Sequence, residues 1–362
     1  MPLLDIVPIG PAGAGKSSLL AAMKHGLDEW EPAPAPALRP DPVTALALAE
    51  AWRSLRADGV EAPVGGGRPA LTDLWFEAVA ESGEPLFDAR LVDYDGDAVA
   101  GEGHPAAKAL AARARAADAV LVVVDGRRVA GLLDGDRDGF ERDMAGVWKL
   151  TASRGKPVRF VVTKWDLVRG RASPARVREA LSTIPGFAAA LRRSTRSDGA
   201  GSAALIPVSV LGDDAGRQAV VPLLSVLPQV LRTAAGHPGH PSGKKGSLVA
   251  GVGANWLSQA VTAVAVRQVL QRLVDTVPER RAARRCAGHA AVGVAMLVEA
   301  AVRTWCDRAT RPADDGDSRA RGKALTRAAD AYEWQLREFR RLHPEADLSA
   351  APSPGLLRRL IG

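Results

Sequence analysis

A glycine-rich segment near the start of the chain combines the residue types that bind phosphate. Residues 10–17 read G-P-A-G-A-G-K-S, between an apolar run over residues 3–9 and an apolar helical pattern that begins at Leu19. Glycines let backbone N–H groups turn toward a phosphate, and the N-terminus of the following helix adds partial positive charge. The pattern therefore predicts a phosphate-binding loop. The residues predicted to line it are Gly10, Gly13, Ala14, Gly15, Lys16, Ser17 and Ser18.

The lysine and the hydroxyl at the end of this segment have separate expected roles. We expect Lys16 to reach the β- and γ-phosphates of a nucleotide and to act in catalysis. We expect the Ser17 hydroxyl to coordinate Mg²⁺. A glycine-rich turn without a ligand is the alternative, which we disfavour because such a turn has no need of both side chains.

A second short motif, D-Y-D-G, covers residues 93–96 at the end of a strand-like run over residues 86–93. A strand at this position should lie beside the phosphate-binding loop. Asp93 is then placed to hold the metal through water, and Gly96 to offer its N–H group to the γ-phosphate. A plain turn is the alternative, because D-x-x-G is a weak signal when it stands alone.

A third motif, T-K-W-D, follows the strand-like run over residues 158–162. The Asp166 carboxylate can accept hydrogen bonds from N1 and N2 of guanine, which adenine lacks, so adenine would leave the carboxylate unpaired. The stem of Lys164 can pack over the base, and Thr163 completes the motif. A surface Lys–Asp pair is the alternative.

In their order along residues 3–232, the three motifs resemble those of a Ras-like P-loop GTPase of the translation-factor-related class, and the chain is most similar to the uncharacterised bacterial type with a helical C-terminal extension. The resemblance implies GTP or GDP and Mg²⁺ as ligands. It implies that Thr72, 21 residues before Asp93, is the switch I threonine, a catalytic residue and metal ligand, with Thr44 as the weaker alternative. It also implies that a backbone N–H group at Ser209 or Val210 meets the guanine O6.

Two departures from the family pattern affect the expected activity. Thr72 lies 56 residues after Lys16, so the resemblance implies a switch I insertion over about residues 28–70. Asp97 follows Gly96 where a Gln or His that positions the attacking water would be expected. Slow GTP hydrolysis in a molecular switch and nucleotide binding without hydrolysis therefore both stay open. Asp95 and His104 are weaker candidates for positioning the water, and a partner could supply an arginine.

The elements around these motifs predict an α/β fold. Strand-like runs cover residues 3–9, 71–79, 86–93, 119–124, 158–162 and 204–208, and helical patterns cover residues 43–57, 106–117, 138–153, 173–181 and 219–232. The unbroken apolar runs are typical of parallel strands that are covered on both faces. We expect a P-loop NTPase fold: a mostly parallel sheet with one antiparallel edge strand. The proline-rich stretch over residues 32–42 predicts an extended surface loop, and residues 184–203 resemble an insertion.

The chain divides into a predicted GTPase domain over residues 1–235, a linker over residues 236–246 and an α-helical C-terminal region over residues 247–362. The net charge of +7 is unevenly distributed, with −1 over the first 235 residues and +8 over the rest. We expect helices over about residues 247–275, 279–309 and 318–343. They pack on one another or on the GTPase domain, lie at a membrane surface, or form a spanning hairpin, since residues 246–266 carry no charge.

The amino-acid composition indicates the class of protein and its expected cellular compartment. Hydrophobic residues make up 47% of the 362 residues, which excludes a disordered or fibrous chain. The two cysteines, Cys286 and Cys306, are too few for a disulfide framework, and the N-terminal residues show no secretory signal, so we expect a cytoplasmic setting, with the basic C-terminal helices leaving peripheral membrane contact open. We expect a protein effector or regulator as partner. Nucleic acid is disfavoured because the basic segments lack interleaved aromatic residues.

Overall fold

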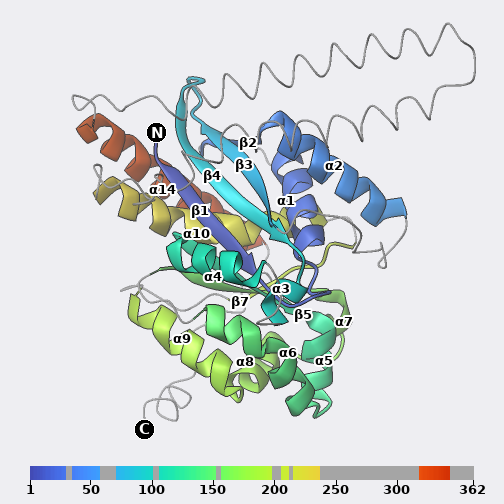
Figure 1. The fold of residues 1–362 in the computed structure, drawn as a ribbon. Coiled ribbons are helices and arrows are strands. Elements are labelled where there is room, and N and C mark those ends of the chain that lie inside the picture. Colours follow the sequence, from blue (N-terminus) through green and yellow to red (C-terminus); the bar gives the residue numbers. More distant parts are fainter. Residues whose placement is uncertain are drawn as a thin grey trace, which may run out of the picture.

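In the described part of the chain, seven strands form one sheet in the order β2-β3-β4-β1-β5-β6-β7, with helices on both faces (Figure 1). The computed structural model describes residues 1–29, 35–57, 71–100, 106–151, 156–197, 205–211, 215–236 and 318–342. The strands are β1 (Leu3–Ile9), β2 (Ala37–Pro40), β3 (Leu71–Val79), β4 (Pro85–Tyr94), β5 (Ala119–Asp125), β6 (Val158–Thr163) and β7 (Leu205–Pro207). The helices are α1 (Lys16–Glu29), α2 (Pro42–Ala57), α3 (Asp97–Ala100), α4 (Ala107–Ala116), α5 (Gly126–Leu133), α6 (Arg137–Leu150), α7 (Asp166–Arg169), α8 (Pro174–Ser182), α9 (Pro185–Ser197), α10 (Ala215–Gly236) and α14 (Ser318–Leu342).

The sheet is mostly parallel and has an antiparallel edge, as the sequence predicts. Strands β4, β1, β5, β6 and β7 pair in parallel, whereas β3 pairs antiparallel with both β4 and β2. The expected surface loop over residues 32–42 was wrong in part, because residues 37–40 form the edge strand β2. A proline is tolerated at the end of an edge strand, where its missing N–H group breaks no ladder.

The central strands are buried because helices cover both faces. Every residue of β5 is buried, and alternate side chains enter different clusters. Ala119, Leu121 and Val123 join the cluster beneath α1 and α10, while Val120, Val122 and Val124 join the cluster with the helices of the other face. This two-sided burial accounts for the unbroken apolar sequence.

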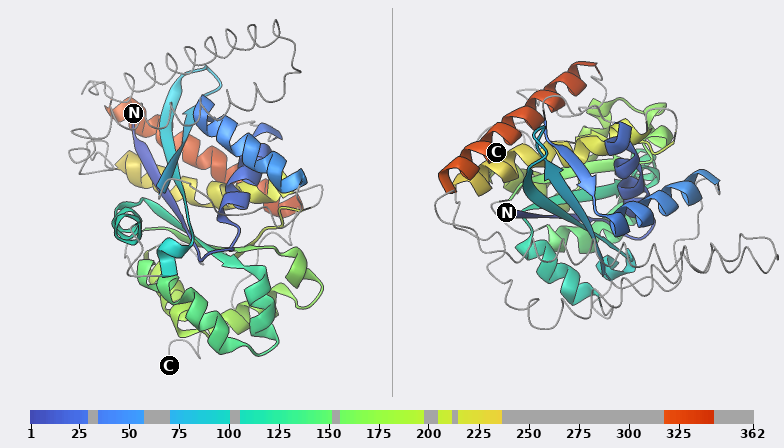
Figure 2. Two further views of the ribbon diagram at one scale, coloured as in Figure 1. Left: turned by 45° about the vertical axis from the view of Figure 1, so that its right-hand side comes forward. Right: turned by 90° about the horizontal axis from the view of Figure 1, so that it is seen from above.

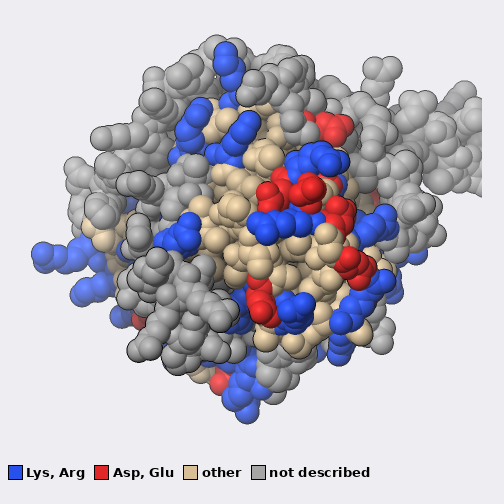
Figure 3. Space-filling model, turned by 90° about the horizontal axis from the view of Figure 1, so that it is seen from below, with Lys and Arg blue, Asp and Glu red and all other residues tan. Residues whose placement is uncertain are grey.

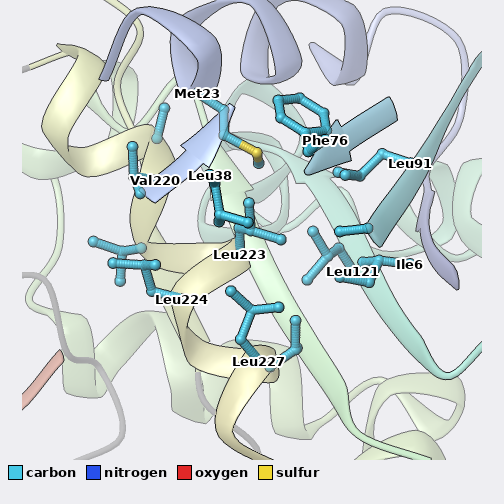
Figure 4. Packing of buried hydrophobic residues seen from close by; sticks show 14 of the residues in the cluster. Ile6, Met23, Leu38, Phe76, Leu91, Leu121, Val220, Leu223, Leu224 and Leu227 are labelled. Atoms are coloured by element: carbon cyan, nitrogen blue, oxygen red, sulfur yellow. The ribbon is translucent and has the colours of Figure 1, made fainter. Parts of the chain in front are cut away.

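Helices α1, α2, α10 and α14 cover the upper face in Figure 1. Figure 4 shows Met23 of α1, Val220 and Leu223 of α10, and Phe76 of β3 meeting in this layer. Helices α1 and α10 are in close contact at Gly26, where an added Cβ would lie 2.0 Å from the carbonyl oxygen of Gly216. The two helices can therefore come this close because neither residue carries a side chain there.

Helix α14 bears out the helix that the sequence predicts over residues 318–343, and it packs along α10 and against β4 (Figure 2). The Tyr332 ring meets Phe87 edge-on at a centroid distance of 6.4 Å, and its hydroxyl donates to the Pro36 carbonyl at 2.7 Å. This part of the predicted C-terminal region therefore shares the core of the sheet. The expected linker and the helices over residues 247–275 and 279–309 lie outside the described residues.

Helices α3 to α9 cover the other face, where acidic side chains lie between basic ones on the described surface (Figure 3). The first part of the segment over residues 184–203, which the sequence suggests is an insertion, forms helix α9 from Pro185. An apolar contact that the local pattern does not reveal holds this helix against the sheet. Phe187 packs against Phe160 of β6 at 4.6 Å and edge-on to Trp148 of α6 at 6.4 Å between ring centroids.

A buried ionic network fastens α4 to the sheet. Asp5 of β1 accepts hydrogen bonds from Arg90 at 2.8 Å and from Arg113 of α4 at 3.1 Å, and Arg113 also bonds Asp73 at 2.9 Å. At the C-terminal end of the same helix, Lys156 donates to the carbonyls of residues 114 and 115. The acidic residue that interrupts the apolar pattern of β1 is therefore the acceptor that holds this helix.

Among the described helices, one is long and apolar enough to cross a membrane by length and composition, the part of α10 from Gly216 to Gly236. Two thirds of that apolar window, 67%, is buried inside the protein. The helix lies between α1 and α14 and contributes Leu223 and Leu227 to the core. Its hydropathy is therefore explained by packing.

Asp88 makes the stability of the fold dependent on pH. Burial, with a contribution from the charge of Glu77 opposite it in the β3–β4 register, raises the pKa of Asp88 to about 6. The folded chain holds the proton more tightly than the unfolded chain, so this contribution to stability is present at low pH and is lost as the pH rises through about 6. We expect Asp88→Asn to raise the free energy of unfolding by about 1–2 kcal/mol at pH 8 and to change it little near pH 4.

Urea unfolding of the variant and the wild type at both pH values measures this difference. An equal difference at pH 4 and pH 8 would show that the Asp88 carboxylate carries no penalty in the folded chain.

Candidate functional site

The three sequence motifs meet at one edge of the sheet. Strand β1 pairs in parallel with β4 and β5, and β5 pairs in parallel with β6, so the carboxyl ends of these strands lie side by side. The loop after β1 contains the glycine-rich segment, the end of β4 contains D-Y-D-G, and the end of β6 contains T-K-W-D. Ligands of open α/β sheets bind at this edge.

The glycines of the loop after β1 each have a physical reason. An added Cβ on Gly10 would lie 2.6 Å from the Val123 carbonyl oxygen of β5, so this position admits no side chain. Gly13 and Gly15 have φ values of +70° and +80°, in the left-handed region that favours glycine. Ala14 is fully buried, and its N–H group closes a turn on the Pro11 carbonyl at 3.2 Å.

Lys16 lies at the first position of α1 and is 5% exposed. Its ammonium group donates to the carbonyls of Gly10 and Pro11, both at 2.9 Å, and lies 4.9 Å from the centre of the Tyr94 ring. Burial lowers the pKa of Lys16 to about 8, against the opposing effect of nearby carboxylates, first among them Asp93. A buried cation at the N-terminus of a helix is suited to neutralise phosphate charge.

Ser17 and Asp93 provide oxygen ligands from two motifs. The Ser17 hydroxyl donates to the Asp93 carboxylate at 2.9 Å, and Ser18 follows in the same turn of α1. A hydroxyl and a carboxylate fit the preference of Mg²⁺ for hard oxygen ligands. The described residues contain no group of three His, Cys, Asp or Glu side chains that could hold a metal.

Thr72 is the second residue of β3 and stands directly opposite Asp93 in the β3–β4 register. Opposite residues of an antiparallel pair project to the same face, which puts the threonine on the side of the sheet that Ser17 occupies. Thr44, the alternative switch threonine, instead has a structural contact. It is 2% exposed at the start of α2, and its hydroxyl accepts the Trp75 N–H at 2.9 Å. This contact makes Thr44 part of the joint between α2 and β3.

Gly96 brings the D-Y-D-G segment against the phosphate-binding loop. An added Cβ on Gly96 would lie 2.3 Å from Cα and 2.4 Å from N of Ala12. Asp95 and Asp97 on either side are exposed, and the Asp97 N–H donates to the Asp95 carboxylate at 3.1 Å. His104 lies outside the described residues.

The T-K-W-D motif is tied directly to the phosphate-binding loop. The Thr163 hydroxyl donates to the Ala14 carbonyl at 2.7 Å. The Lys164 ammonium donates to the Gly13 carbonyl at 2.8 Å and to the Asp125 carboxylate at 2.7 Å. Lys164 has a φ of +49°, a conformation that non-glycine residues rarely adopt and that the surrounding bonds must maintain.

The last part of the motif turns toward the segment after β7. Asp166 is exposed at the start of α7, and its carboxylate accepts a hydrogen bond from the Ser209 hydroxyl at 2.9 Å. The Ser209 N–H donates to the side-chain oxygen of Gln218 at 3.2 Å. Because the Ser209 N–H group is already bonded, Val210 is the better candidate for the backbone N–H group that is expected to meet the guanine O6.

Several residues of the site were not identified from the sequence. Asp125 at the end of β5 both caps α5 and bonds Lys164; Tyr94 contacts the phosphate-binding loop; and Gln218 of α10 orients Ser209. The first two had a signal, because Asp125 ends an apolar strand at the ligand-binding edge and Tyr94 lies inside the D-x-x-G motif. Gln218 had none, since a single polar residue on a helix gives no indication of its partner.

No protein-family model matches the chain, and no curated protein sequence matches it. The comparisons therefore add nothing to the chemistry that the residues themselves indicate.

The Lys164–Asp125 pair should contribute measurably to stability. Replacing Lys164 with Met leaves the Asp125 carboxylate, whose side chain is 7% exposed, without this cation and removes the donor to the Gly13 carbonyl. We expect Lys164→Met to lower the free energy of unfolding by about 2 kcal/mol. Denaturant unfolding of Lys164→Met, Asp125→Asn and the double variant measures the coupling.

A coupling free energy of about 1 kcal/mol or more is expected from this double-mutant cycle. Strictly additive effects would mean that the two side chains do not stabilise one another.

Proposed function

We propose that this chain is a GTP-binding protein with a Ras-like P-loop domain, which hydrolyses GTP slowly to GDP and phosphate with Mg²⁺ and acts as a molecular switch. The observation that carries the proposal is the bonding of the T-K-W-D motif to the phosphate-binding loop through Thr163 and Lys164. Direct hydrogen bonds hold the proposed base-recognition motif beside the proposed phosphate-binding motif. One nucleotide must contact both motifs at once, so the two must lie side by side.

The phosphate end of the proposed site rests on Lys16 and on the backbone of residues 13–18. The ammonium group of Lys16 neutralises the β- and γ-phosphates, and the N–H groups at the start of α1 point toward the same anion. Bound Mg²⁺, held by Ser17 and through water by Asp93, with Thr72 as a further ligand, would neutralise charge on the phosphate oxygens.

The base end rests on Asp166. Its carboxylate accepts the N1 and N2 hydrogens of guanine, while the Ser209 hydroxyl holds one of its oxygens in place. The Val210 N–H donates to the guanine O6, and the stem of Lys164 lies over the base. Adenine offers no hydrogens to the carboxylate, so both hydrogen bonds from the base would be lost.

In the proposed hydrolysis, a water oxygen forms a bond to the γ-phosphorus. The bond between that phosphorus and the bridging oxygen breaks, the bridging oxygen leaves with GDP, and the water protons end on the phosphate product and solvent. Lys16 and the Gly96 N–H stabilise the charge that spreads over the γ-phosphate oxygens. Loss of the γ-phosphate then releases the segment that begins at Gly96, and a protein effector or regulator in the cytoplasm reads this change.

A second candidate function is nucleotide binding without intrinsic hydrolysis. The observation that favours it is Asp97, which is exposed beside Gly96 and whose N–H is bonded to Asp95. A carboxylate at this place repels the phosphate charge and does not replace the Gln or His that orients the water. Release of phosphate by the purified chain decides between the two functions.

The base assignment predicts a change of specificity. Asp166→Asn replaces the carboxylate that accepts from guanine N1 and N2 with an amide. The amide can donate a hydrogen bond to the oxygen that xanthine carries in place of the guanine amino group. We expect the affinity for GTP to fall by about a hundredfold and the affinity for xanthosine triphosphate to rise. Titration with fluorescent GTP, ATP and xanthosine triphosphate analogues measures both.

Asp134→Asn is the matched control, because Asp134, the residue after α5, is an exposed carboxylate in an ion pair with Arg171. Equal binding of ATP and GTP by the wild type would contradict guanine recognition while leaving the phosphate-binding loop in place.

The close contact of Gly96 predicts a separation of binding from turnover. Gly96→Ala forces the segment away from Ala12, which moves the N–H group expected at the γ-phosphate. We expect GTP turnover to fall by about a hundredfold while the affinity for GDP stays within about threefold of the wild type. Single-turnover phosphate release and GDP titration test this.

Gly170→Ala is the control, since an added Cβ there meets no atom within 4 Å. An unchanged rate in Gly96→Ala would remove Gly96 from the catalytic machinery.

A further inference from the structure

The Tyr94 side chain contacts both ends of the glycine-rich loop after β1. This residue ends β4, is 6% exposed, and accepts a hydrogen bond at its hydroxyl from the Gly10 N–H at 3.1 Å. The centre of its ring lies 4.9 Å from the ammonium nitrogen of Lys16. One side chain of the D-Y-D-G motif therefore meets the first and the seventh residue of the G-P-A-G-A-G-K-S loop.

These contacts close a cycle through the loop. Lys16 donates to the Gly10 carbonyl at 2.9 Å, so Gly10 bonds Tyr94 through its N–H and Lys16 through its oxygen. A phenol hydroxyl is costly to bury unless it is hydrogen-bonded, and a cation over an aromatic ring gains most where water is excluded. The cycle therefore holds the Lys16 side chain in one direction, and with a second hydrogen donated to the Pro11 carbonyl it leaves one ammonium hydrogen for a ligand.

The neighbours of Tyr94 add contacts to the same loop and helix. Asp93 accepts from Ser17, and Gly96 lies against Ala12. Asp95, between them, is exposed. The end of β4 is thus anchored at Tyr94, and the first residue beyond it faces solvent.

We propose that Tyr94 is a positioning residue that fixes the phosphate-binding lysine through Gly10 and the aromatic ring, and so makes the chain discriminate between a nucleoside triphosphate and a diphosphate. This inference rests on the proposed function. Tyr94 acts through Lys16, because Lys16 is the group that reaches the γ-phosphate. It also sets the boundary between the part of the site that stays in place and the segment from Asp95 onward.

The chain offers a matched control, since its two tyrosines are both buried and both bond a backbone group. Tyr332 bonds the Pro36 carbonyl in the core between α14 and β2, away from the three motifs. Tyr94→Phe keeps the ring and loses the bond to Gly10, whereas Tyr94→Leu loses both. Tyr332→Phe loses one hydroxyl bond elsewhere in the core.

The experiment measures the affinities for GTP and GDP, and kcat and KM for GTP, in the full chain with Mg²⁺. We expect Tyr94→Phe to lower the GTP-to-GDP affinity ratio about fivefold and kcat about tenfold, with KM changed less than about threefold. Tyr94→Leu should lower both further. Tyr332→Phe should leave the affinity ratio and kcat unchanged even where thermal unfolding shows an equal loss of stability.

A wild-type affinity ratio in Tyr94→Phe, or the same fall in Tyr332→Phe, would overturn the role of Tyr94 while the proposed function stands. A wild-type chain that binds no guanine nucleotide would overturn the proposed function, and this inference with it. A wild type that binds but does not hydrolyse leaves the affinity ratio as the deciding measurement.

Discussion

The parallel pairing of β1 with β4 on one side and β5 on the other is the constraint on which the rest of the structure depends. Parallel strands bring their carboxyl ends to one edge, so the glycine loop, D-Y-D-G and T-K-W-D become neighbours although Gly13 and Lys164, which bond each other, are 151 residues apart in the chain. That arrangement requires crossover helices on both faces. It therefore accounts for the two-sided burial of β5 and for the two separate hydrophobic clusters.

Close backbone contact is what joins the three motifs into one site. Gly10 lies against β5, Gly96 lies against Ala12, and Gly126 lies 2.5 Å, measured from an added Cβ, from the Lys164 carbonyl oxygen. Hydrogen bonds that Thr163 and Lys164 donate, and one that the Tyr94 hydroxyl accepts, then cross between the loops. These contacts hold the three loops against one another.

Buried charged side chains of the described residues fall into different environments. The arginines of the network around Asp5 hold α4, and Lys156 caps the same helix. Lys16 differs, because it is buried among backbone carbonyls and an aromatic ring, with a lowered pKa. A cation in this environment gains from an approaching anion, so the site and the structural network use buried charge for different purposes.

The sequence by itself determined the α/β class, the ends of most strands, the helix over residues 318–342 and the candidate residues, because periodicity, glycine spacing and short motifs are local properties. It did not predict β2, the packing of α9, the bond from Tyr332 to Pro36 across 296 residues or the bond from Tyr94 to Gly10 across 84 residues. Those contacts arise when the sheet and helices pack together. An isolated tyrosine or proline-rich segment carries no information about its distant partner, so only the tertiary structure could decide them.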